Sequence, residues 1–149
     1  MARGDWTTFE EFSVDLGNGV HNLGSDQLKL LLIDNTTPPT AADATPRLAD
    51  YVGNEVSTAG GYPANGIALT GEAFAEAGGV ATLDDTGNIS LAQNGSGFTD
   101  AYWGILYNDT AAADQAIGFV DLGGPVSEQA GVISITWNAG GILTGTITS

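Results

Sequence analysis

Apolar residues follow two different periods along this chain, and the change between them falls near residue 24. Residues 7–24 read TTFEEFSVDLGNGVHNLG and have the i, i+3, i+4 apolar spacing of an amphipathic helix. Thr7 and Thr8 are candidate caps, because Glu10 and Glu11 follow three residues later and complete possible capping boxes. The apolar stripe consists of Phe9, Phe12, Leu16, Val20 and Leu23.

We expect this helix to be short. Gly17 and Gly19 would each cost about 1 kcal/mol inside a helix, so the sequence predicts an end near Leu16 and a turn after it. His21, the single histidine, stands beside that turn. Its imidazolium could face the negative end of the helix dipole, but a packing or capping role is favoured.

The rest of the chain reads as strands and turns. Residues 27–33 (QLKLLLI) form a short apolar run, which is typical of a strand buried on both faces. Residues 36–50 contain three prolines and predict a loop, and residues 53–66 are expected to be irregular. Residues 67–75 (IALTGEAFA) alternate and predict one strand.

Further strands are predicted on either side of turn sequences. Residues 80–83 and 89–92 flank the turn DDTGN. Residues 102–107 and 117–122 are apolar on both faces and predict a central hairpin, in which Gly104 and Gly118 make room for Trp103 or Phe119. The segments predicted as a terminal hairpin around the turn NAGG are 132–137 and 142–148.

Many short strands with glycine-rich turns and no later helical period indicate an all-β fold. The sequence therefore predicts a single-domain β-sandwich, jelly-roll-like, with a short N-terminal helix. We expect the sandwich to span residues 9–149 and residues 1–8 to form an N-terminal arm.

Charge narrows the range of partners. The chain has 18 acidic residues, three basic residues (Arg3, Lys29 and Arg47) and a net charge of −15. Nucleic-acid binding requires clustered Lys and Arg, and anionic membrane surfaces repel such a chain, so neither partner is expected. The scattered acids favour a protein of complementary charge, or serve only to keep the protein soluble.

Targeting signals are not evident in the sequence. The first twelve residues contain no apolar core for a signal peptide. No window reaches the ~18 apolar residues of a membrane span. We therefore expect a protein made and kept in the cytoplasm, or one that leaves by a route the sequence does not encode.

Catalytic signatures are weak. There is no cysteine and no G-x-S-x-G motif, so any nucleophile–base pair would depend on His21 alone. Paired carboxylates remain an alternative for a carbohydrate-active enzyme, and the candidate acids are Asp100, Asp121, Glu72, Asp109 and Asp114. Because no nucleophile–base constellation appears, we expect no enzyme, no catalytic residue and no cofactor.

Two polar turns offer oxygen ligands for a cation. Residues 84–88 (DDTGN) and 108–114 (NDTAAAD) lack the spacing and the terminal glutamate of an EF-hand loop. Asx-turns at hairpin tips are the favoured interpretation, with a weak surface calcium or sodium site as the alternative.

Three segments resemble a group of small tailed-bacteriophage virion proteins. They are FEEFSVDLGNGVHNLGSDQLKLLLIDNTTPP, GGYPANGIALTG and YWGILYNDTAAADQAIGFVDLGGPVSEQAGVISITW. The shared layout is an aromatic strand ending in LYNDT, a strand ending in an aspartate with an aliphatic neighbour, and a final hairpin. The resemblance covers nearly the whole chain, and LYNDT is its most distinctive motif.

This resemblance implies a capsid decoration, or cement, protein without catalytic residues. Its partners would be the major capsid protein and further copies of itself in a symmetric oligomer. It would be assembled into the virion in the host cytoplasm. A tail or fibre component that adsorbs to host glycans is the first alternative, and a free calcium-dependent binding module is another.

The predicted arm carries the candidate interface. Arginine and tryptophan are enriched at interface hot spots, so residues 1–8 are expected to dock on the capsid or on a neighbouring subunit. A frayed terminus is the plain alternative. The interface residues expected from the sequence are Arg3, Trp6, Thr7 and Phe9.

Overall fold

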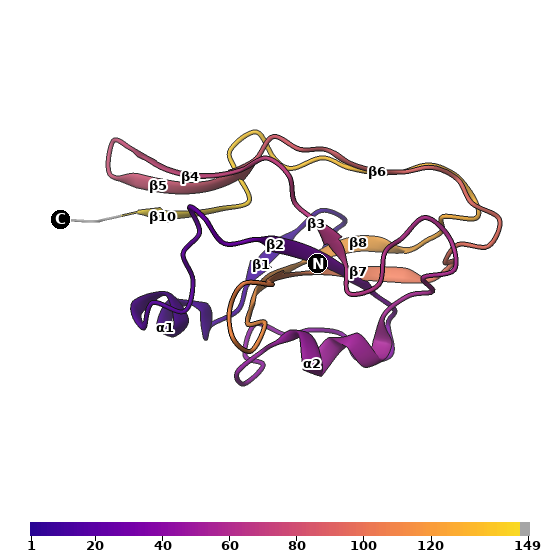
Figure 1. Ribbon diagram of the computed structural model, residues 1–149, viewed down its shortest axis with the longest axis horizontal. Coiled ribbons are helices and arrows are strands. Elements are labelled where there is room, and N and C mark those ends of the chain that lie inside the picture. Colours follow the sequence, from indigo (N-terminus) through magenta and orange to yellow (C-terminus); the bar gives the residue numbers. More distant parts are fainter. Residues whose placement is uncertain (147–149) are drawn as a thin grey trace.

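The computed structural model describes residues 1–146 of the protein, in which antiparallel strands form two layers (Figure 1). One layer is a five-stranded sheet in the order β1-β8-β7-β2-β3. Its strands are β1 (Trp6–Thr8), β2 (Leu28–Ile33), β3 (Ile67–Ala68), β7 (Ala101–Asn108) and β8 (Ala116–Val126). The predicted central hairpin is confirmed, because β7 and β8 pair in antiparallel fashion.

Two smaller sheets form the second layer. One has the order β10-β5-β4, and the other pairs β6 with β9. Their strands are β4 (Glu72–Ala77), β5 (Val80–Asp85), β6 (Ile89–Leu91), β9 (Ile133–Ile135) and β10 (Leu143–Thr146). The architecture confirms the predicted all-β, sandwich-like single domain.

The apolar run of β2 is explained by its central position. Leu28, Leu30 and Leu32 belong to the core between the two layers, whereas Leu31 and Ile33 belong to a second core on the opposite face of the sheet. Both sets are fully buried. A strand that contributes to two cores needs apolar residues on both faces, as the sequence predicted.

Helical segments lie on the outer face of the five-stranded sheet (Figure 1). The predicted N-terminal helix is present as α1 (Phe12–Gly17), and it ends where its first glycine predicted. It begins later than expected, because Thr7 and Thr8 lie in β1 and cap nothing. Leu16 of the predicted stripe is 42% exposed.

A second helix occupies part of the predicted loop 36–50. Helix α2 (Leu48–Tyr51) is followed by the single-turn 3-10 helix η1 (Val52–Asn54). At its start the Asp50 carboxylate accepts a hydrogen bond from the Arg47 amide at 3.1 Å. Tyr51 is buried in the second core, and it stacks on Phe9 with ring centroids 6.0 Å apart. Tertiary packing therefore stabilises a helix too short to show a period in the sequence.

The strands differ from the predictions at two places. Residues 67–75 do not form one strand, since the chain leaves β3 and enters the other layer at β4. The terminal hairpin is wrong: β9 pairs with β6, and β10 pairs with β5. The NAGG turn does form, with the Gly141 amide donating to the Asn138 carbonyl at 2.9 Å. Residues 147–148 of the predicted return strand lie outside the described residues.

Glycines in the central hairpin do make room for side chains, but not for the predicted ones. A Cβ on Gly118 would lie 2.5 Å from Trp6 Cζ2 and 2.6 Å from the Thr7 carbonyl oxygen. A Cβ on Gly104 would lie 2.9 Å from Val120 Cγ1. Gly118 is therefore the position at which β1 and its tryptophan approach the sheet.

Candidate docking cavity beside the N-terminal strand

The structure separates the four residues predicted to form an interface. Trp6 and Thr7 are half-buried in β1, which pairs with β8 at one edge of the five-stranded sheet. Arg3 is exposed just before that strand. Phe9 is 1% exposed and packs 5.2 Å from the ring of Phe119, so its side chain has no surface to offer a partner. Residues 6–8 of the predicted arm are thus part of the sheet.

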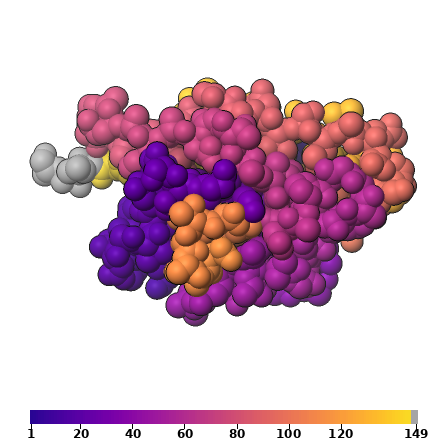
Figure 2. Space-filling model, in the orientation of Figure 1, coloured from indigo at the N-terminus to yellow at the C-terminus, as the bar shows by residue number. Residues whose placement is uncertain are grey.

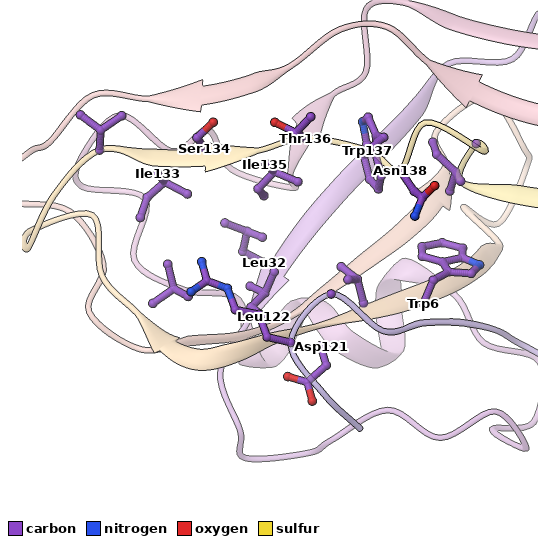
Figure 3. Close-up of a pocket in the computed structure, with 17 residues that line it drawn as sticks. Trp6, Leu32, Asp121, Leu122, Ile133, Ser134, Ile135, Thr136, Trp137 and Asn138 are labelled. Atoms are coloured by element: carbon purple, nitrogen blue, oxygen red, sulfur yellow. The ribbon is translucent and has the colours of Figure 1, made fainter.

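A cavity of about 300 Å³ opens between the two layers beside β1. Its floor includes Leu32 and Leu122, and β9 crosses above it (Figure 3). Ile133 and Ile135 point toward the floor, whereas Ser134 points away. The cavity is at the lower end of the range for ligand pockets, and it suits one or two apolar side chains or a small ligand.

Two tryptophans lie at one end of this cavity, Trp6 from β1 and Trp137 from the segment after β9 (Figure 3). The Trp6 indole donates to Thr8 Oγ1 at 3.1 Å, and the Trp137 indole donates to Asp85 Oδ2 at 2.9 Å. Because both N–H groups already have acceptors, the rings remain for apolar contact with an occupant.

Among the described residues, Asp121 and Arg3 are the charged residues at the cavity wall, and the Asp121 carboxylate points away from the cavity (Figure 3). Asp121 Oδ1 accepts from the Gly123 amide at 2.7 Å, and its carbonyl accepts from the Gly4 amide at 2.7 Å. The Asp121 carbonyl therefore links the N-terminal segment to β8. Among residues 1–146, the Arg3 guanidinium has no carboxylate within ion-pair distance.

The candidate catalytic acids do not gather at this cavity. Of the five acids, Asp121 alone lines it within the part of the chain described. Asp109 forms an ion pair with Lys29, with Nζ and Oδ2 2.9 Å apart. Glu72 Oε1 accepts from Gln27 Nε2 at 3.1 Å. The arrangement is suited to holding an apolar group, and it presents no second acid for hydrolysis of a glycoside.

The loop after β7 is organised by Asn108, which is completely buried. Its Oδ1 accepts from the Thr110 and Ala111 amides at 2.9 and 3.1 Å, which confirms the predicted Asx-turn. Its Nδ2 lies 2.7 Å from Asp26 Oδ2 and 3.1 Å from His21 Nδ1. No local pattern in the sequence indicates this link, which joins residues more than eighty positions apart. The other predicted Asx-turn also forms, because Asp85 Oδ1 accepts from the Gly87 amide at 2.8 Å.

His21 is a packing residue, as favoured from the sequence. Its ring is buried 5.4 Å from that of Phe12, and Nε2 has no hydrogen-bond partner among the described residues. Burial lowers the pKa of His21 below its ordinary value of 6.5, against the opposing effect of Asp15 and Asp26. The folded protein therefore favours the neutral ring, which disagrees with the idea of an imidazolium at the helix end.

This burial predicts a pH dependence of stability. Because the pKa is lower in the folded state, the unfolded chain binds the proton first as the pH falls. The stabilisation is complete above 6.5 and is lost as the pH falls from there through the lowered pKa. Urea denaturation of the wild type at pH values between about 5 and 8 should show this loss.

The matched variant is His21→Gln, which is neutral throughout that range and removes the only histidine. Its free energy of unfolding should be nearly flat where that of the wild type declines. Equal slopes for the two proteins would contradict the assignment. Asp43 does not interfere, because hydrogen bonds from Thr40 and Tyr51 outweigh burial and lower its pKa below 3.8.

Residues 1–146 show neither a membrane-spanning helix nor a metal-binding cluster, and comparisons with known proteins find no match. No helix in this range is both long and apolar enough to cross a membrane. Within the same range, no three acidic or histidine side chains cluster in a way that could hold a metal ion. In comparisons with known proteins, no family model, no curated protein and no solved structure matches the chain.

Proposed function

We propose that the protein is a virion structural protein of a tailed phage, which binds the assembled head shell as a decoration, or cement, protein. The observation that carries the proposal is the interlayer cavity beside β1, which is open, apolar and flanked by Arg3 and Trp6. Such a cavity can receive an apolar anchor of the major capsid protein. The resemblance of the LYNDT region to virion proteins supports the same assignment.

The physical effect of such binding is mass action. A protein that binds the assembled shell but not its free subunits stabilises the shell by RT ln(1 + [L]/Kd) at each site, or about 2.7 kcal/mol when [L] is 100 times Kd. A symmetric oligomer of the protein would match a symmetry axis of the shell. The net charge of −15 keeps the unbound protein soluble during assembly in the host cytoplasm.

The location of the protein in purified particles tests this function. Quantitative mass spectrometry should find it in a fixed ratio to the major capsid protein, and immunogold label should lie over the head. Label confined to the tail, or absence from particles, would contradict the proposal.

A variant at the cavity mouth tests the docking site separately. Val132 lines the cavity and is 66% exposed, so Val132→Asp places a charge there without opening the core. We expect it to weaken rebinding to particles stripped of the protein at least tenfold, because the entering apolar group would have to desolvate a carboxylate. Rebinding is measured by co-sedimentation.

Val14→Asp is the matched control, since Val14 is 50% exposed on α1 and the change in charge is the same. It should bind like the wild type. If both variants bind equally, the cavity is not the docking site. If both lose binding, general repulsion is responsible.

A glycan-binding role in the tail or fibre is the second candidate, and the pair of tryptophans favours it. Sugars pack on indole rings, and Asn138 among the lining residues offers a polar group to hydroxyls. A glycan array distinguishes the two roles. Saturable binding to a glycan that is lost in Trp137→Ala supports the glycan-binding role. No binding to any glycan supports the decoration role.

A further inference from the structure

Strand β4 is the longest edge strand among the described residues. It spans six residues at the margin of the three-stranded sheet, whereas the edge strands β1, β3, β6 and β9 have two or three and β10 has four. Residues 73–77 are all exposed. The β4–β5 hairpin lies at the periphery of the molecule, in rose at the upper left of Figure 2.

This edge lacks a bulge, a proline and a lysine, three of the devices that usually block further pairing, and its charged side chains are two glutamates. Its register with β5 runs from Glu72↔Asp85 to Ala77↔Val80 without a bulge, and the strand contains no proline and no lysine. Its outward backbone groups are therefore available to a further strand. The hairpin is closed tightly, because Glu76 Oε1 accepts from the Gly79 amide at 2.6 Å.

The side chains of β4 divide into two distinct faces. Glu72, Phe74 and Glu76 lie on one face at the period of two, and only alanines lie on the other. Phe74 is 41% exposed, which is unusual for an aromatic residue without a partner. The pattern along this face is therefore acid, aromatic, acid, and it reads the same in both directions. Phe74 and Glu76 are exposed, whereas Glu72 is half-buried and its Oε1 accepts from Gln27 Nε2.

A second copy of this chain does not fit the edge. If two β4 strands paired about Phe74, Glu72 would lie opposite Glu76 at both ends, and like charges directly opposite are destabilising. Shifting the register by two residues would place Phe74 opposite a glutamate. No other part of the chain fits, because its three basic residues are far apart in the sequence.

The geometry points to β4 as a site of strand addition for an extended segment of another protein, with the pattern basic–x–apolar–x–basic. The partner's apolar residue would lie beside Phe74, and its two basic residues would lie opposite Glu72 and Glu76. Backbone hydrogen bonds supply the affinity and the alternating side chains supply the selectivity. This inference does not depend on where the protein resides, so it and the proposed function can fail separately.

Synthetic peptides test the edge directly. We expect the labelled peptide TKTFTKT to bind the full chain, as measured by fluorescence anisotropy, at least tenfold more tightly than TETFTET. Binding should weaken as salt rises, because exposed charges are screened. Alternate backbone amides of a bound strand face its partner, so only one of the two alternating sets of N–H groups in TKTFTKT donates to β4. N-methylation of that set should abolish binding, whereas N-methylation of the other set should not.

Variants identify the residues involved and the strand direction. Phe74→Ser should weaken binding of TKTFTKT at least tenfold, whereas Val14→Ser, at a somewhat more exposed apolar position on α1, should not. Glu76→Lys should favour TETFTKT if the peptide runs antiparallel to β4, and TKTFTET if it runs parallel. Far-UV circular dichroism confirms that the hairpin persists in each variant.

Three outcomes would overturn the inference. One is that TKTFTKT and TETFTET bind equally well or not at all. Another is that N-methylation of neither set of N–H groups affects binding. The third is that the free protein self-associates in sedimentation experiments and Phe74→Ser abolishes this, which would assign the edge to a second copy.

Discussion

Replacing Asn108 by leucine is expected to lower the free energy of unfolding by about 2–4 kcal/mol, because a completely buried amide would lose all its hydrogen bonds. The side chain joins the loop after β7 to the turn after α1 through its four partners, Thr110, Ala111, Asp26 and His21. Leucine has a similar volume and fills the site, so the loss isolates the polar contacts. The melting temperature should fall by roughly 6–12 °C for a loss of about 3 kcal/mol.

Asn88→Leu is the matched control, because Asn88 is exposed. Its stability should change by less than about 0.5 kcal/mol. A second variant, Asn108→Asp, keeps the acceptor for the loop amides but brings a carboxylate against Asp26. It should be destabilised as well, and Asp26→Asn should restore part of the loss. No rescue would show that the Asn108–Asp26 contact is unimportant.

Gly118→Ala is expected to destabilise the protein by about 2–3 kcal/mol, because a methyl group there overlaps two parts of β1. Its Cβ would lie 2.5 Å from Trp6 Cζ2 and 2.6 Å from the Thr7 carbonyl oxygen. The backbone contact cannot be relieved by rotating a side chain, so β1 must move away from β8. Urea denaturation measures the loss, and tryptophan fluorescence should report a more solvated Trp6.

Two further variants locate the origin of the effect. Gly131→Ala, at a glycine with open space around it, should leave stability unchanged. In the Trp6→Ala background the cost of Gly118→Ala should shrink, since one of the two obstructing groups is gone. Additive costs would show that Gly118 and Trp6 do not interact.

The sequence predicted those elements whose signal is local. The strand β2 and the hairpin of β7 and β8 consist of apolar residues on both faces, so their burial is predictable from their own sequence. Both are confirmed. Pairing of the short strands was not predictable, because β9 meets β6 some forty residues away and the turn beside it gives no hint of that choice. Helix α2 was missed because four residues show no period.

The candidate site was predicted in part, and by residue type alone. Arg3 and Trp6 were chosen as interface residues, and both line the cavity. Trp137 and Ile135 were not connected with them, since the cavity exists only where β9 crosses the five-stranded sheet. Phe9 was placed on the surface because its own sequence neighbourhood does not reveal the aromatic partners that bury it.

The pairing of β6 with β9 and of β5 with β10 has a consequence for biosynthesis. The five-stranded sheet uses residues 6–126 and can assemble once these have left the ribosome. The other layer cannot close until residues as late as 146 emerge, so the leucine face of β2 is uncovered in the nascent chain. Contacts of such long sequence separation form slowly. A translation pause in that interval would therefore promote aggregation, and a chaperone that holds apolar strands would improve the yield.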